Sequence, residues 1–161
     1  MSSQMQLLQI ALDEKDIVYT PDWVARDMVE FFKPTGNILE PSCGDGAILK
    51  YLPDADWCEI EKGRDFFSWH NAVDWVVGNP PFRQFKQFMS HAYTLSENIV
   101  FLIPADKPFN SMPNAMMMNE KGKIVHMRYY GEVFDAIHRP MAAFHFQRGY
   151  NGPMWSSLYG S

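Results

Sequence analysis

Cysteine and long apolar runs are both scarce in this sequence. The 161 residues include two cysteines, Cys43 and Cys58, too few for a disulfide framework and without the spacing of a zinc or redox site. No window approaches the roughly 18 consecutive apolar residues of a membrane helix, and residues 1–10 lack the basic start and apolar run of a signal peptide. The sequence therefore predicts a soluble protein of the reducing cytoplasm, with no membrane partner.

Basic residues are outnumbered as well. The formal net charge is −5, from 14 Lys and Arg against 19 Asp and Glu, which argues against a protein that coats nucleic acid through bulk charge. The charge is uneven, because residues 1–80 carry 6 basic and 14 acidic side chains whereas residues 81–161 carry 8 and 5. We expect a polyanionic partner to contact the second half.

Strand and helix patterns alternate along the chain without a linker or a repeat. Short apolar stretches predict strands at residues 37–40, 56–61, 73–77 and 99–103, with helices from residue 21 and from residue 85. Residues 123–130 and 141–147 predict a closing antiparallel pair. We expect a single compact domain over residues 1–161, with a three-layer α/β/α Rossmann-like fold and a mostly parallel sheet that ends in an antiparallel hairpin.

Several local expectations follow from residue chemistry. Residues 3–12 have the spacing of a short amphipathic helix, and Thr20 is placed to cap a helix whose first residue is Pro21. We expect Gly44 and Gly46 to open a helix through Leu52, and residues 65–69 to be extended. Residues 104–122 form a long Pro- and Met-rich connection, and only residues 149–161 follow the last expected strand.

Two acidic turns follow predicted strands, where open parallel sheets bind their ligands. The sequence Leu-Glu-Pro-Ser-Cys-Gly-Asp-Gly begins at Leu39, and its glycines allow a ligand to approach the backbone. It matches neither a dinucleotide fingerprint nor a P-loop, and an ordinary tight turn is the alternative. Glu59 and Glu61 end the next strand, where a carboxylate accepts from ribose hydroxyls or is simply solvated.

The sequence Asn-Pro-Pro-Phe at residues 79–82 follows a third predicted strand. Pro80 and Pro81 fix their own φ angles and cannot donate backbone hydrogen bonds, so they form a rigid rim of carbonyl groups. With the carboxamide oxygen of Asn79 they offer two acceptors to one planar amino group, and Phe82 can stack on the ring that carries it.

These segments, with Tyr-Thr-Pro at residue 19 and Asp-Phe-Phe at residue 65, resemble in their order the S-adenosylmethionine-dependent N6-adenine DNA methyltransferases of the gamma motif order. The resemblance spans roughly residues 17–147, and Asn-Pro-Pro-Phe is its most specific element. It implies methyl transfer to the N6 amino group of a flipped adenine, with S-adenosylmethionine as the cofactor and DNA as the partner.

The resemblance also implies a role for each matched residue. Thr20 would meet the cofactor carboxylate, and Glu40 its ammonium group. Glu59 would bind the ribose hydroxyls, Ile60 and Phe66 would pack on the adenine ring, and Asp65 would accept from the adenine amino group. The implied cofactor contacts are Tyr19, Thr20, Pro21, Glu40, Ser42, Gly44, Gly46, Glu59, Ile60, Asp65, Phe66 and Asn79, and the catalytic segment is Asn79, Pro80, Pro81 and Phe82.

The chain departs from this family in two ways. Only a few residues separate Glu61 from Asp65, where relatives have a helix, and no separate target-recognition domain is present. Sequence selection is then weak, or comes from loops or from a second subunit, either a second copy or a different chain. The histidines show no metal-ligand spacing, so no metal is expected.

Two other functions fit the same motifs. The first is methylation of amino groups in RNA or of a protein glutamine. The second is a cofactor-binding subunit that is active only with a partner, which the acidic first half and the missing recognition domain favour. A restriction-modification system and a phage or other mobile element are the two biological settings considered.

Overall fold

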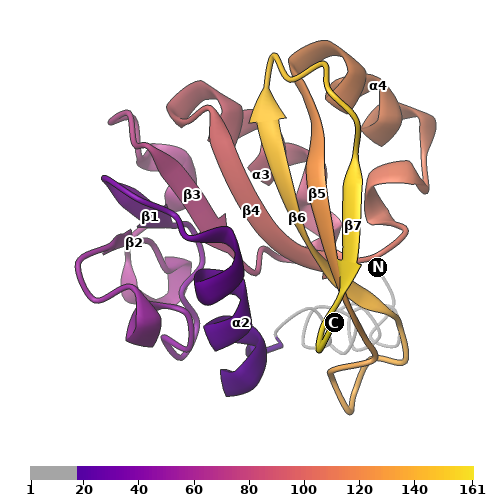
Figure 1. Ribbon diagram of the computed structural model, residues 1–161. Helices are drawn as coiled ribbons and strands as arrows, with labels where there is room; N and C mark the ends of the chain where they lie inside the picture. The colour runs from indigo at the N-terminus through magenta and orange to yellow at the C-terminus, as the bar shows by residue number, and fades with distance from the viewer. Residues whose placement is uncertain (1–17) are drawn as a thin grey trace, which may run out of the picture.

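The centre of the molecule is one mixed sheet of seven strands, seen in a computed structural model that describes residues 18–161 (Figure 1). The strand order is β2-β1-β3-β4-β6-β5-β7. The strands are β1 (Ile38–Glu40), β2 (Asp56–Trp57), β3 (Trp75–Gly78), β4 (Asn98–Pro104), β5 (Gly122–Gly131), β6 (Met141–Arg148) and β7 (Trp155–Leu158).

Strand directions divide the sheet into a parallel half and a hairpin half. β2, β1, β3 and β4 are mutually parallel, β6 runs antiparallel to both β4 and β5, and β7 runs parallel to β5. This arrangement confirms the predicted α/β Rossmann-like class with an antiparallel hairpin near the C-terminus. The carboxyl ends of β1 and β3 meet at one edge of the sheet.

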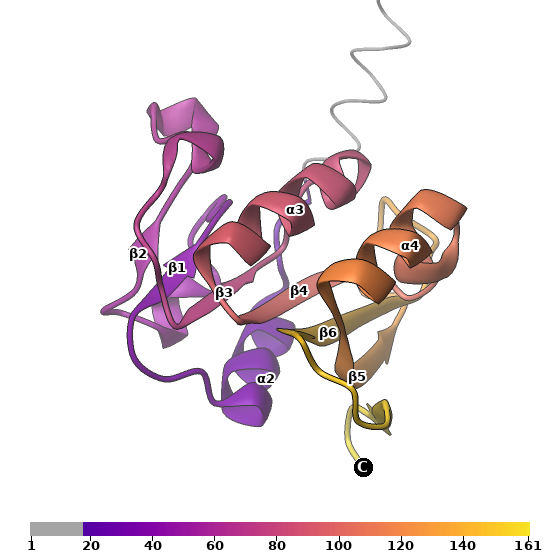
Figure 2. The same cartoon turned by 90° about the horizontal axis from the view of Figure 1, so that it is seen from above.

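Helices cover both faces of this sheet. Figure 2 shows α3 (Phe85–Leu95) and α4 (Met112–Lys121) on one face and α2 (Asp22–Phe32) on the other. The predicted helix at residue 85 is confirmed, and it buries Phe85, Phe88 and Ala92. None of the helices within residues 18–161 is long and apolar enough to span a membrane.

The core is deepest at β4, which lies between β3 and β6. Residues 99–103 of β4 are fully buried, and Phe101 pairs with Phe144 of β6. An uninterrupted apolar run is typical of a strand that is covered on both faces, so the sequence prediction for this strand is confirmed.

Polar contacts attach α2 to the hairpin half of the sheet. Asp27 of α2 accepts hydrogen bonds from the Arg128 guanidinium, at 3.0 and 3.1 Å, and from the Tyr130 hydroxyl at 2.7 Å. The predicted Thr20 cap is wrong, because Pro21 occupies the N-cap position with ψ 143° and the helix begins at Asp22. The Thr20 hydroxyl instead accepts from the Asn79 side chain.

The segments that follow β1 and β2 are shorter than predicted. No α-helix follows the glycine turn; a single 3-10 turn, η1 (Leu49–Tyr51), forms instead, and Leu52 leaves the helical region directly before Pro53. β2 stops at Trp57 rather than continuing through residue 61, because the chain turns into η2 (Ile60–Lys62) and Gly63, at φ 74°. Residues 66–68 form the 3-10 turn η3 (Phe66–Ser68) rather than an extended segment.

The second half contains two elements that sequence patterns missed. The expected long connection at residues 104–122 folds into η5 (Lys107–Phe109) and α4, whose N-cap is Ser111 with its hydroxyl accepting from Asn114 N. The C-terminal segment adds β7 as a seventh strand beside β5. The predicted helix at residues 3–12 lies outside the described residues.

Candidate functional site

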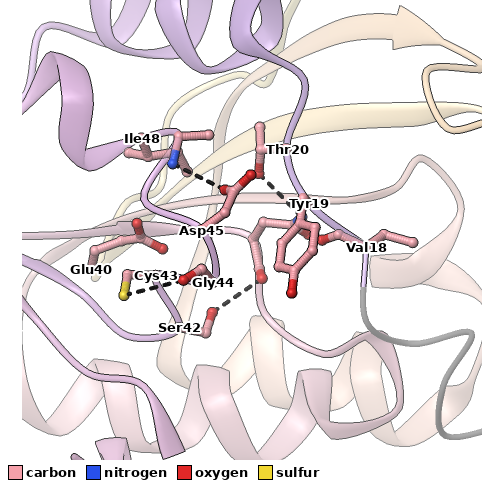
Figure 3. A pocket seen from close by; sticks show the side chains of 11 residues that line it. Val18, Tyr19, Thr20, Glu40, Ser42, Cys43, Gly44, Asp45 and Ile48 are labelled. Carbon is pink, nitrogen blue, oxygen red and sulfur yellow. Dashed lines mark hydrogen bonds between the residues drawn. The ribbon is translucent and has the colours of Figure 1, made fainter. Parts of the chain in front are cut away.

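The glycine turn after β1 brings backbone to the carboxyl edge of the sheet. Gly44 and Gly46 have φ angles of 53° and 87°, which favour glycine. The Tyr19 ring lies over Gly44, where a Cβ atom would be 3.1 Å from Tyr19 Cδ1. Figure 3 shows Tyr19 and Thr20 on one side of this turn and Glu40 on the other. Tyr19 and Thr20, which precede α2, therefore meet the end of β1 at one pocket.

Glu40, the last residue of β1, is a buried acid with an exposed fraction of 1%. Burial, with smaller contributions from the charges of Glu59 and Asp45, raises the pKa of the Glu40 carboxyl to about 8. Its Oε2 atom has no hydrogen-bond partner among the described residues. A buried acceptor of this kind favours a ligand that brings a donor.

The close packing around Glu40 depends on Gly78 at the end of β3. A Cβ atom at Gly78 would lie 2.9 Å from Pro41 Cδ and 3.2 Å from Glu40 Oε1. The φ angle of Gly78 is not in the left-handed region, so its constraint is spatial. Sequence patterns missed this residue, although glycine immediately before Asn-Pro-Pro-Phe was the available signal.

The Asn79 side chain is held in one orientation by two acceptors. Its Nδ2 atom donates to the Val18 carbonyl at 3.1 Å and to Thr20 Oγ1 at 3.2 Å. The Asn79 Oδ1 atom is buried and has no partner among the described residues. The Ser42 hydroxyl donates to the Asn79 backbone carbonyl at 3.1 Å and joins the turn after β1 to the segment after β3 (Figure 3).

The cavity among these groups is small and carries acidic side chains. Its volume is about 20 Å³, room for one water-sized group, so a larger ligand must extend beyond the cavity. It contains Glu40 and Asp45 but neither Lys nor Arg, an arrangement that suits a cationic group rather than a phosphate. The lining residues are Val18, Tyr19, Thr20, Glu40, Ser42, Cys43, Gly44, Asp45, Ala47, Ile48 and Asn79.

The acid expected to bind ribose lies beside the same turn. Glu59 Oε2 accepts from Gly44 N at 2.8 Å, so its carboxylate borders the glycine turn, and Ile60 is 68% exposed beside it. Asp65 is engaged locally, because its Oδ1 atom accepts from Phe67 N at 3.0 Å and caps η3. Phe66 is 3% exposed and stacks on Phe88 at 5.0 Å, which places its ring in the core.

The catalytic segment expected from the sequence lies at the carboxyl end of β3. Pro80 is buried, and Pro81 is the N-cap of the 3-10 turn η4 (Phe82–Gln84). Phe82 is 5% exposed, so a base can stack on it only after the atoms that cover the ring move. The structure brings together Thr20, Glu40, Ser42, Gly44, Glu59 and Asn79, whereas Asp65 and Phe66 are used in local packing.

Comparison with known proteins gives the fold family. No protein-family model and no curated protein sequence matches this chain. Solved structures do match, among them one assigned as a class I S-adenosylmethionine-dependent methyltransferase from Listeria monocytogenes, with 15% identity, a TM-score of 0.65 and coverage of 96% of this chain and 72% of that chain.

Two further matching structures represent different kinds of methyltransferase. A type I restriction-modification methyltransferase subunit from Streptococcus thermophilus has 13% identity and a TM-score of 0.62, and the alignment covers 82% of this chain but 45% of that subunit. A structure assigned as an RNA methyltransferase from Pyrococcus horikoshii has 12% identity and a TM-score of 0.56, with 95% and 100% coverage. The chain therefore has the class I methyltransferase fold.

Proposed function

We propose that this chain is an S-adenosylmethionine-dependent methyltransferase that acts on the N6 amino group of adenine in DNA. One observation carries the proposal: two buried oxygen atoms, Glu40 Oε2 and Asn79 Oδ1, lie at one pocket and have no hydrogen-bond partner among the described residues. The fold and the order of the motifs agree with it, since the structural neighbours include methyltransferases of this class.

The residues at the pocket fit the cofactor. Glu40 would receive the ammonium group, and the Thr20 hydroxyl would donate to the carboxylate, since in its bond with Asn79 the hydroxyl oxygen is the acceptor. A Cβ atom at Gly46 would meet nothing within 4 Å, so the turn leaves its backbone open to the ligand there, while Glu59 and exposed Ile60 would hold the nucleoside part outside the small cavity. When bound, S-adenosylmethionine supplies an electrophilic methyl group.

The acceptors at residues 79 and 80 would help a weak nucleophile, the amino nitrogen of adenine, to react. The exocyclic nitrogen of adenine is a poor nucleophile because its lone pair is delocalised into the ring. Asn79 Oδ1 and the Pro80 carbonyl would accept its two N–H groups and favour a pyramidal nitrogen whose lone pair points at the methyl group. The bound cofactor would supply the methyl group, and Asn79 with the Pro80 carbonyl would hold the attacking nitrogen in line with it, so positioning would do the catalytic work and the proton would be lost to water after transfer.

DNA is the favoured substrate on two grounds. The Tyr-Thr-Pro segment that precedes α2 belongs to the resemblance with DNA adenine methyltransferases, and restriction-modification subunits are among the structural neighbours. The base must leave the duplex to reach Asn79, and Phe82 must be uncovered to stack on it. A restriction-modification system or a mobile element would supply the biological setting.

The test is a methylation assay on separate pools of unmethylated duplex DNA, single-stranded DNA and RNA, with nucleosides identified by mass spectrometry. We expect N6-methyladenine in a DNA pool. Asn79→Ala should reduce turnover at least 100-fold, far more than it weakens cofactor binding, because one acceptor for the target amine is lost. Asn119→Ala, at an exposed position of α4, is the matched control and should remain active.

The remaining outcomes separate the alternatives. N6-methyladenine only in RNA would move the assignment to RNA, and transfer to a glutamine-containing protein would move it to protein. Cofactor binding without any product would favour a subunit that requires a partner. Full activity of Asn79→Ala would refute the catalytic role of this segment.

A further inference from the structure

β7 forms one border of the sheet and pairs with β5 alone (Figure 1). Tyr159 N donates to Tyr129 O at 2.9 Å, which fixes the direction of the backbone groups at this end of the strand. Because these groups alternate along a strand, the N–H groups of Ser156 and Leu158 point away from β5, toward the open edge. This edge has no strand partner among residues 18–161.

The open edge is uncharged and apolar. Residues 149–161 contain no Asp, Glu, Lys or Arg. Four large side chains along it are exposed: Met154 (49%), Trp155 (60%), Leu158 (60%) and Tyr159 (45%). Edge strands of soluble monomers are usually protected by charge, proline or a bulge, and none of these interrupts residues 155–158.

The opposite border of the sheet is protected in this way. β2 is two residues long, and the Arg64 guanidinium lies 4.0 Å from the centre of the Trp57 ring. Lys62 lies 5.4 Å from the same ring. Short length and two cations discourage edge pairing at β2, so the exposure of β7 is specific to that border.

β7 is also firmly attached to the rest of the molecule. Ser157 Oγ accepts from Arg128 Nη1 at 3.2 Å and lies 2.9 Å from His126 Nε2. The Tyr159 ring packs on Trp23 of α2 with 4.8 Å between centroids. The edge is therefore a preformed strand, and a partner that pairs with it does not have to order it first.

A groove accompanies the edge on the face opposite α2. Its volume is about 470 Å³. Ser157 and Tyr159 face α2, and the alternation of side chains puts Leu158 on the other face. The lining residues are Met127, Tyr129, Ser156, Ser157, Leu158 and Ser161.

We infer that β7 is the interface of a homodimer, in which β7 of a second copy pairs antiparallel with it and continues the sheet. A two-fold axis at Ser156 places Ser156 opposite the partner's Ser156 and Leu158 opposite the partner's Met154, so the outward N–H groups of Ser156 and Leu158 find main-chain acceptors and apolar side chains meet. The Leu158 carbonyl keeps its bonds from Arg128 Nη1 and Ser161 and is not needed as an acceptor in this register. A two-fold axis brings the same surface of both copies together, so charged side chains there would face like charges. An edge without charged side chains avoids this repulsion.

The area is sufficient for a specific contact. Each of the four exposed side chains presents on the order of 100 Å², so a pair of copies covers about 800 Å² before the main chain and the groove are counted. Specific interfaces bury upwards of roughly 1,000 Å² in total, which the main-chain edges and the groove bring within reach.

The test is the mass of the full chain in solution, measured by sedimentation between about 1 and 100 µM. We expect twice the 18.7 kDa of one chain at the upper end. Leu158→Lys places a charge on each side of the two-fold axis and should raise the dimer Kd at least 100-fold. Gln87→Lys, on an exposed position of α3, makes the same charge change away from β7 and should leave the Kd unchanged.

Amide hydrogen exchange tests the pairing itself. In the wild-type protein the N–H groups of Ser156 and Leu158 should exchange more slowly as concentration rises, and in Leu158→Lys they should not. If Leu158→Lys does not fold, Ser156→Glu serves instead. A wild-type chain of single mass at 100 µM, a dimer that survives both substitutions, or a dimer with unprotected β7 amides overturns the inference.

Discussion

Binding of S-adenosylmethionine should release a proton from Glu40 at neutral pH. The Glu40 carboxyl has a pKa of about 8 and is therefore mostly neutral at pH 7, whereas the ammonium group of the cofactor favours the carboxylate. With that pKa, about 0.9 proton leaves per site when the cofactor binds at pH 7. Removing this proton makes binding about tenfold weaker, or 1.4 kcal/mol, than binding to a site that is already ionised.

Calorimetric titration in two buffers of different ionisation enthalpy measures this proton directly. The affinity should rise about tenfold from pH 6 to pH 7, level off near pH 8 and fall above it, where the ligand amine loses its own proton. Methylthioadenosine lacks the amino-acid end, so its binding should release no proton and should show no such rise.

Two variants make the assignment specific. Glu40→Gln should abolish the proton release and weaken S-adenosylmethionine binding more than tenfold, while methylthioadenosine binding changes little. Glu61→Gln, at an exposed acid of η2, should behave as wild type. A release below about 0.2 proton at pH 7, or an unchanged release in Glu40→Gln, would refute the role of Glu40.

Two further predictions concern stability. Gly78→Ala should lower the free energy of unfolding by about 1–3 kcal/mol in urea titrations, because its Cβ would meet Pro41 and Glu40; an unchanged midpoint would contradict the packing argument. Burial lowers the pKa of His145 to about 4, so the unfolded chain binds more protons between pH 4 and 6.5. Stability should be constant above pH 6.5 and fall by about 1–2 kcal/mol toward pH 4, and His145→Gln should remove that loss, as measured by urea unfolding across this pH range.

The parts of the fold that sequence could predict are those with strong periodicity. The apolar run at Ile99–Ile103 and the i, i+3, i+7 spacing that begins at Phe85 gave β4 and α3 correctly, because burial alone decides such segments. Short segments governed by single side chains were predicted wrongly. Asp65 caps η3 through one hydrogen bond, which no periodic pattern records.

For the site as well, the sequence predicted some residues, and only the folded chain reveals the role of others. The motifs placed Glu40 and Asn79 at one edge of the sheet, since strand ends of a parallel sheet meet there. The bond from Asn79 Nδ2 to Thr20 Oγ1 joins residues 59 positions apart, so only the folded chain shows that Thr20 orients the carboxamide instead of capping α2. The need for glycine at residue 78 is likewise a matter of space between two strands.

The hydrogen-bonding groups of the pocket suit the proposed methyl transfer to an amine. Burial keeps the Glu40 carboxyl mostly neutral near pH 7 until a cation binds, and Asn79 does not ionise. What both offer is a buried oxygen that has no donor among the described residues. A ligand with an ammonium group would satisfy the first oxygen and a substrate with an amino group the second, so binding of the two molecules would complete the hydrogen bonding of both.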